Sequence, residues 1–309
     1  MKRLLVISIL LISFCGMSQQ FPQYTQIPYH QFSLNPALAG IEKCVDFRLL
    51  YRMQWVNFPG APSGGFLTGS GQIKPKRTKY KAPTHGVGGR LMYDQIGPFT
   101  QTKIEGAYAI HLRLTRDLRL SFGTYLGMFL FSYDASSVVV QQNDPTIMSS
   151  VPNKIYPDGS VGMWLDGKKF YTGFTVQQMF SSVWKDIGTQ SRYRVHFTLN
   201  GGYKWKIREN FTLIPSMLLK IPTTGPWAMD INLMMDYKNV FSFGLGYRNI
   251  DAVTAMFRVK FLKYLSIAYS FDFVTSNIRN GIAHTHEFSL GISTCRKKSR
   301  KPSDCPAFE

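Results

Sequence analysis

The chain has 309 residues, a formal net charge of +18 and an aromatic content of 14%. Beyond the N-terminal apolar run, no stretch reaches the roughly 20 apolar residues of a transmembrane helix, which excludes a helical membrane protein. A basic surplus of this size indicates an anionic partner, and the classes to consider are nucleic acid, an acidic protein, and the phosphates of lipid and lipopolysaccharide.

The chain begins MKRLLVISILLISFCGMS, which has the features of a secretory signal. A basic start is followed by an apolar run and small residues, and we place the cleavage site after Ser18. The bulky Phe14 directly before Cys15 argues against lipid attachment at that cysteine. Residues 1–18 are therefore assigned to a signal peptide, and export of the mature chain argues against nucleic acid as its partner.

Alternation of apolar and polar residues dominates the rest of the chain and predicts β-strands with one apolar face. Residues 193–207, YRVHFTLNGGYKWKI, alternate over more than twice the length of an ordinary soluble strand. Similar runs predict fourteen strands, with twelve to sixteen as the range. In chain order they lie near 44–57, 64–74, 86–95, 101–114, 118–132, 158–166, 168–178, 193–207, 210–221, 226–238, 240–248, 252–262, 264–274 and 284–294.

The connections between these strands indicate how they are arranged. From the fourth strand onward, tight turns alternate with longer loops such as 133–157 and 179–192, as in outer-membrane barrels with short periplasmic turns and long external loops. A β-sandwich has shorter strands, and no convincing amphipathic helix supports an α/β or α+β fold. We therefore expect an all-β fold, a single closed antiparallel transmembrane outer-membrane β-barrel over residues 43–294. Residues 19–42 would lie in the periplasm or the lumen, and residues 295–309 would form a basic periplasmic tail.

Basic residues gather in two segments on the predicted periplasmic side. We take them as candidate docking residues for an acidic partner, with a solvated rim as the equally weighted alternative. They are Lys74, Lys76, Arg77, Lys79, Lys81, Arg296, Lys297, Lys298, Arg300 and Lys301.

The polar rows of the predicted strands should face the barrel interior. The candidate lumen-facing residues are Arg48, Arg52, His111, Arg113, Arg194, His196, Lys204 and Arg258. In a barrel of this size such side chains either line a cationic channel or pair with carboxylates, and we favour pairing.

Three cysteines remain after signal cleavage, an odd number in an oxidising compartment. The first and last strands of a closed, even-stranded barrel are neighbours, so Cys44 and Cys295 would lie close together at the periplasmic end of the seam. A disulfide there would hold the barrel closed. Pairing of Cys295 with Cys305 is the alternative.

Motifs for enzyme chemistry are missing from the sequence. It has no G-x-S-x-G nucleophile elbow, and GVGG at residues 86–89 lacks the Lys-Ser/Thr of a phosphate-binding loop. His284 and His286 share one face of a strand, but no third metal ligand follows at an obvious spacing. We expect no enzyme activity, no cofactor and no metal site.

A set of short motifs gives a more specific indication. YHQFSLNPALAG, YRMQWVNFPGAPSG, FTLNGGYK, FGLGYRNIDAV and HEFSLGI, taken together and in this order, resemble the PorP/SprF family of type IX secretion and gliding-motility membrane proteins. The resemblance runs from near residue 24 to the last strand. It implies a noncatalytic outer-membrane barrel that works with periplasmic motor and ring components, or in the export and surface attachment of adhesins.

The sequence thus supports two main hypotheses. The first is an outer-membrane partner in type IX secretion that binds a secreted surface protein outside and an envelope component inside, among outer-membrane lipid and lipopolysaccharide. The second is a channel for anionic or small amphipathic solutes, motivated by the cationic inward rows. A soluble secreted β-sandwich is a third alternative.

Overall fold

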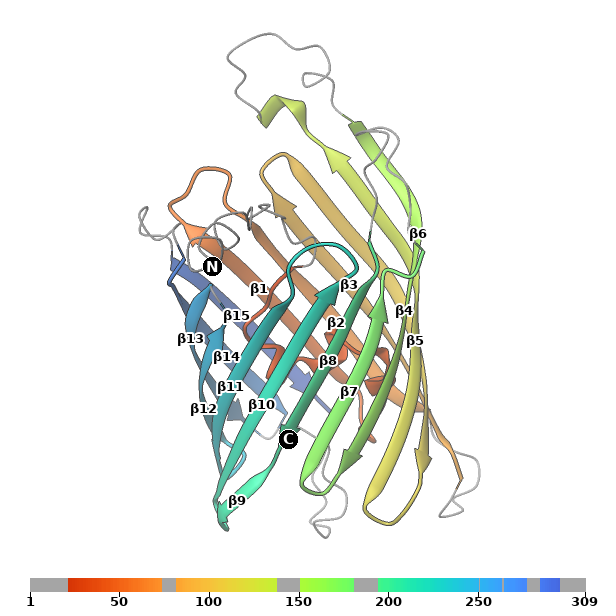
Figure 1. Ribbon diagram of the computed structural model, residues 1–309. Coiled ribbons are helices and arrows are strands. Elements are labelled where there is room, and N and C mark those ends of the chain that lie inside the picture. Colours follow the sequence, from red (N-terminus) through yellow and green to blue (C-terminus); the bar gives the residue numbers. More distant parts are fainter. Residues whose placement is uncertain are drawn as a thin grey trace, which may run out of the picture.

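The computed structural model is a tilted β-barrel that encloses the N-terminal segment (Figure 1). It describes residues 22–73, 82–137, 151–180, 194–249, 251–262, 264–276 and 284–294. In the first half of the wall the strands are β1 (Asp46–Val56), β2 (Ser63–Ile73), β3 (Thr84–Ile96), β4 (Phe99–Arg113), β5 (Leu118–Tyr133), β6 (Val151–Gly167) and β7 (Phe170–Gln177). The second half consists of β8 (His196–Tyr203), β9 (Trp205–Arg208), β10 (Phe211–Pro222), β11 (Ala228–Tyr237), β12 (Phe241–Arg248), β13 (Ala252–Phe261), β14 (Leu265–Val274) and β15 (His284–Ser293).

The sheet closes on itself with every neighbouring pair antiparallel. The first strand pairs with the last, from Asp46 opposite Ser293 to Val56 opposite His284. Both β8 and β9 pair with β10 and are separated only by Lys204, so together they form one wall strand. The barrel therefore has the fourteen wall strands that the alternation predicts.

Side chains alternate between the two faces of the wall, as the sequence pattern requires. On β12, Phe241, Phe243 and Leu245 are exposed on the outer face, while Ser242 and Arg248 are buried inside. Comparable exposed Leu, Ile, Phe, Val, Met and Tyr side chains occur around the whole barrel. An apolar outer face with a polar interior is the arrangement of a barrel in lipid.

The strand limits differ from the prediction mainly at β6. The sequence predicts a loop up to residue 157, whereas β6 begins at Val151 and pairs with β5 along its length. Pro157 obscures this strand in the sequence because proline lacks the N–H of a ladder hydrogen bond. It is tolerated there because it lies outside Val161–Asp166, the part of β6 that pairs with β7. The predicted external loop is correspondingly shorter.

Residues 22–43, which we call the plug, occupy the lumen (Figure 1, orange-red). Three short 3-10 helices, η1 (Ile27–Tyr29), η2 (Gln31–Ser33) and η3 (Pro36–Leu38), bury most of their side chains against the wall. A further 3-10 helix, η4 (Ala135–Ser137), follows β5. None of the helices in the described parts of the chain is long and apolar enough to cross a membrane. Of the two locations left open for the N-terminal segment, its described residues take the lumen.

Candidate functional site: the plugged lumen

The wall holds the plug largely by its backbone carbonyl groups. Side chains of β1, β3, β4, β5 and β7 reach inward to these oxygens. Their contacts are Arg48 Nη1 to Tyr29 O (3.1 Å), Gln177 Nε2 to Leu34 O (2.9 Å), His111 Nε2 to Ala39 O (2.9 Å), Arg119 Nη1 to Ile41 O (3.1 Å), Arg90 to Ser33 O and Tyr125 to Phe32 O. Irregular backbone inside a barrel has no ladder partners, so these bonds satisfy groups that would otherwise be buried unpaired.

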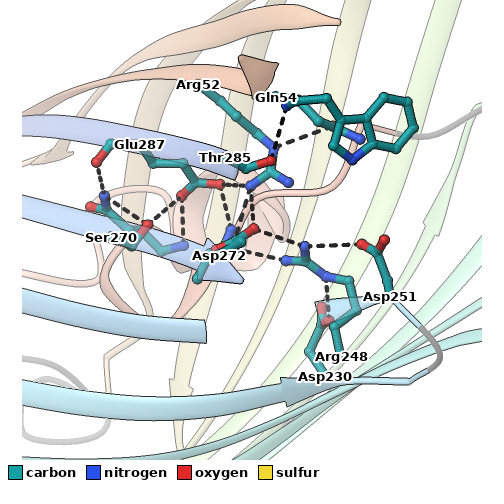
Figure 2. Close-up of polar contacts among 12 residues, drawn as sticks. Arg52, Gln54, Asp230, Arg248, Asp251, Ser270, Asp272, Thr285 and Glu287 are labelled. Carbon is teal, nitrogen blue, oxygen red and sulfur yellow. Dashed lines mark hydrogen bonds and ion pairs between the residues drawn. The ribbon is translucent and has the colours of Figure 1, made fainter. Parts of the chain in front are cut away.

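The first turn of the plug lies against a cluster of buried charges from β1, β14 and β15 (Figure 2). The backbone nitrogens of Thr25 and Gln26 donate to the Glu287 carboxylate at 2.7 and 3.0 Å. The Thr25 hydroxyl donates to Asp272 at 2.7 Å, and Arg52 forms ion pairs with both Asp272 and Glu287. Because β1 and β15 meet at the closure of the barrel, this cluster joins the plug to the seam.

Arg248 extends the same cluster toward β11. Its Nε lies 2.9 Å from Asp230 Oδ1 and its Nη1 lies 3.1 Å from Asp272 Oδ2 (Figure 2). Glu287 and Asp272 are no more than 1% exposed, so Glu287 depends on Arg52 for its counter-charge and Asp272 depends on both arginines. A buried charge without a partner is strongly unfavourable, so the set is stable only as a whole.

Other lumen charges are also paired. The ion pairs are Arg48 with Asp46, Arg90 with Glu105, Lys103 with Asp158, Arg119 with Asp166, Lys220 with Asp230, and Arg258 with Asp236. Three of these pairs, Arg90 with Glu105, Arg119 with Asp166 and Lys220 with Asp230, join adjacent strands, where opposite charges on one face support each other. Of the candidate lumen-facing cations, Arg48, Arg52 and Arg258 thus contact carboxylates.

Glycines on the inner wall make room for η3 and the residues beside it. A Cβ at Gly123 would lie 2.5 Å from the Pro36 carbonyl oxygen, and one at Gly86 or Gly162 would overlap the plug as well. Asn35 fixes the helix between these strands, since its Oδ1 accepts from Ala37 N at 2.9 Å and its Nδ2 donates to Met163 O at 3.0 Å. We call the wall surface around Gly86, Gly123 and Gly162 the seat of η3. It was not predicted from the sequence, where the inward-facing glycines are the only indication of it.

The structure places the predicted lumen-facing residues at different depths. Arg52, His111, His196 and Arg258 are buried, Arg48, Arg194 and Lys204 are partly buried, and Arg113 is exposed at the end of β4. Residues that the prediction left out, above all Glu287, Asp272 and Arg248, carry much of the contact with the plug.

Other predicted features fall on the outer face or outside the described residues. His286 faces outward and bonds to the Tyr269 hydroxyl at 2.8 Å. The parts of the chain that the structure describes contain no group of three or more His, Cys, Asp or Glu placed to hold a metal. The candidate docking residues, at 74–81 and 296–301, all lie outside the described residues.

Cys44 is disulfide-bonded, and the other three cysteines lie outside the described residues. Asp46 pairs with Ser293, and the Thr294 nitrogen donates to Val45 O at 2.9 Å, so the residue next to Cys44 contacts the residue that precedes Cys295 in the sequence. We therefore expect mass analysis of non-reduced peptides to find Cys44 linked to Cys295. The Cys44→Ser variant should lose about 2–4 kcal/mol of unfolding free energy. Recovery of a Cys295–Cys305 peptide with Cys44 as a free thiol would contradict this pairing.

Comparisons with known proteins bear on fold and family. No curated protein matched the chain. Among solved structures it is similar to a Pseudomonas aeruginosa FadL homologue, with 11% identity, a TM-score of 0.49, and coverage of 88% of this chain and 94% of that chain. It is also similar to the Ralstonia pickettii toluene transporter TbuX, with 8% identity, a TM-score of 0.48, and coverage of 90% and 95%.

The family comparison covers most of the sequence. Residues 16–292 match the model of the type IX secretion system membrane protein PorP/SprF. Proteins of this family are noncatalytic membrane proteins. Together with the closed barrel and its apolar outer face, this match shows that the chain belongs to the PorP/SprF family of type IX secretion system membrane proteins and is an outer-membrane β-barrel.

Proposed function

We propose that this protein is a noncatalytic scaffold of type IX secretion and gliding motility, exported with a cleaved signal peptide. It binds a secreted surface protein or adhesin at its external loops and docks on an envelope component at its periplasmic side. The single observation that carries this proposal is the plugged lumen. A barrel filled by its own chain offers its two ends, rather than a wide channel, as working surfaces.

The electrostatics of the interior favour a scaffold over the alternative, a channel for anionic or small amphipathic solutes. An anion channel needs unneutralised cations along its path. Here Arg52 and Arg248 share Asp272, and Arg258 has Asp236 as its partner. These pairs fix the plug and the wall strands instead of attracting a passing anion.

The two ends of the barrel suit different partners. At the end with tight turns, the sequence carries the basic segments 74–81 and 296–301, which are matched in charge to an acidic periplasmic protein. At the other end the sequence has its longer connections, and loops of this kind often carry binding functions, which suits recognition of a folded cargo. Lipid and lipopolysaccharide would surround the apolar belt between these ends.

The test is a pull-down from native membranes with a copy tagged after Glu309. We expect a type IX component and a surface protein to be recovered with the barrel.

Replacing the five basic residues of segment 74–81 with Ser should weaken periplasmic docking roughly tenfold, because each surface ion pair contributes about 0.2–1 kcal/mol. A matched variant with Lys206 and Arg208 of β9 replaced by Ser should keep the partner.

Two outcomes would count against the scaffold. The first is repeated recovery of the barrel alone in mild detergent. The second is equal partner loss from the 74–81 variant and from the β9 variant, which would mean that general charge rather than a docking segment holds the partner.

A further inference from the structure

The plug does not fill the lumen evenly. Between it and the wall formed by β8, β10 and β11 lies a cavity with about 20 Å³ of room for the centres of water molecules. That space suits about one or two waters. Its lining includes Tyr24 and Gln31 of the plug and Asn200, Ser216 and Asn232 of the wall.

Two buried residues of the plug that line this cavity each have a polar atom without a hydrogen-bond partner among the described residues. Tyr24 and Gln31 are 3% and 7% exposed, and the Tyr24 hydroxyl and Gln31 Oε1 have no hydrogen-bond partner among the described residues. Buried polar atoms of this kind are normally satisfied by water. The cavity has the room and the polar lining to hold water.

On the periplasmic side, the cavity ends at a layer of apolar side chains. The facing pairs of β10 and β11 are, in order from the outer side, Leu218 with Asp230, Ser216 with Asn232, and Ile214 with Met234. The first two pairs line the cavity, and the third packs against Tyr29 of the plug. Met256 joins them, and we call Tyr29, Ile214, Met234 and Met256 the apolar ring.

Polar groups return immediately beyond the ring. The next facing pair is Thr212 with Asp236, and Asp236 pairs with Arg258 at 3.1 Å. The Arg258 guanidinium lies 4.7 Å from the centre of the Tyr29 ring. Along this face the lumen is thus polar, then apolar over a single layer, then polar again.

We propose that this face is a passage for water and small hydrated ions, closed by the apolar ring. A short apolar constriction between hydrated compartments blocks permeation because water leaves it. Ion pairs flank the ring on both sides, Lys220 with Asp230 and Arg258 with Asp236, so the open passage discriminates little between small cations and anions. This function is additional to the scaffold and independent of any protein partner.

The proposal is tested by planar-bilayer recordings of the full mature protein in KCl. Tyr29→Ala removes the plug's part of the ring and should raise the steady conductance about tenfold, with weak ion selectivity. Tyr29→Phe should stay closed, because the Tyr29 hydroxyl has no hydrogen-bond partner among the described residues. The matched control is Tyr24→Ala, a buried tyrosine of the same segment on the cavity side of the ring, which should stay within about twofold of the wild type.

A wall variant makes the test independent of plug stability. Met234→Ser makes the ring polar from the β11 side and should also raise the conductance, with folding checked by heat-modifiable mobility on gels. If Tyr29→Ala and Met234→Ser conduct no better than Tyr24→Ala, the ring is not the barrier and the proposal fails. If Tyr24→Ala opens equally, general loosening of the plug replaces the ring as the explanation.

Discussion

Replacing Arg52 with Ala should lower the free energy of unfolding by about 3–5 kcal/mol, the cost of removing one partner from a buried ion pair. Arg52 is 5% exposed and pairs with Asp272 and Glu287, which are themselves buried. Its loss leaves Glu287 without its main counter-charge while that carboxylate still accepts from the plug at Thr25 N and Gln26 N. Thermal and denaturant unfolding of the purified barrel in detergent measures the change.

An exposed ion pair provides the matched control. Lys168 and Asp117 pair near the β6–β7 turn, where both side chains are about half exposed. Lys168→Ala should cost no more than about 1 kcal/mol, because surface ion pairs contribute little. Adding Glu287→Gln to Arg52→Ala should recover part of the loss by removing the uncompensated charge. Equal losses for Arg52→Ala and Lys168→Ala would show that the buried cluster does not fix the plug and the seam.

The strands were predictable because their signal is local. In β12 every second residue from Phe241 to Tyr247 is apolar, and the same period recurs in each wall strand. Lipid on one side and a polar lumen on the other impose this period on the sequence. Where the local signal is interrupted, as at Pro157 in β6, the prediction set the strand limit at the wrong residue.

The plug was harder to predict because its contacts are neither local nor periodic. Arg119 and His111 donate to plug carbonyls more than 70 residues away, and any residue of the plug presents such an oxygen. The sequence therefore indicates which side chains face inward but not which backbone they bind. The partners of the buried charges could not be predicted from the sequence for the same reason. Arg52 could be assigned to the lumen, but its pairing with Asp272 depends on the closure of β1 against β15.

Replacing Gly123 with Val should displace η3 from the wall and loosen the plug. The Cβ that the substitution adds would meet the Pro36 carbonyl oxygen at 2.5 Å and the Ala37 nitrogen at 2.6 Å. Both are backbone atoms, so no side-chain rotation relieves the overlap. Overpacking of this kind costs about 1–3 kcal/mol, and the plug can avoid the cost by leaving its seat. We expect hydrogen exchange of the plug amides to accelerate about tenfold or more, since about 1.4 kcal/mol of destabilisation corresponds to a factor of ten.

A glycine on the outer face of the neighbouring strand is the control. A Cβ at Gly106 would meet nothing closer than the Leu126 carbonyl oxygen at 3.9 Å. Gly106→Val should leave plug exchange unchanged, and valine in a strand should keep or slightly raise the stability of the barrel. Unchanged exchange in Gly123→Val would mean that η3 adjusts in place, and the inward glycines would then not define the seat. Only Gly123 approaches the plug, whereas Gly106 does not. Faster exchange in both variants would therefore point to a general response of the wall.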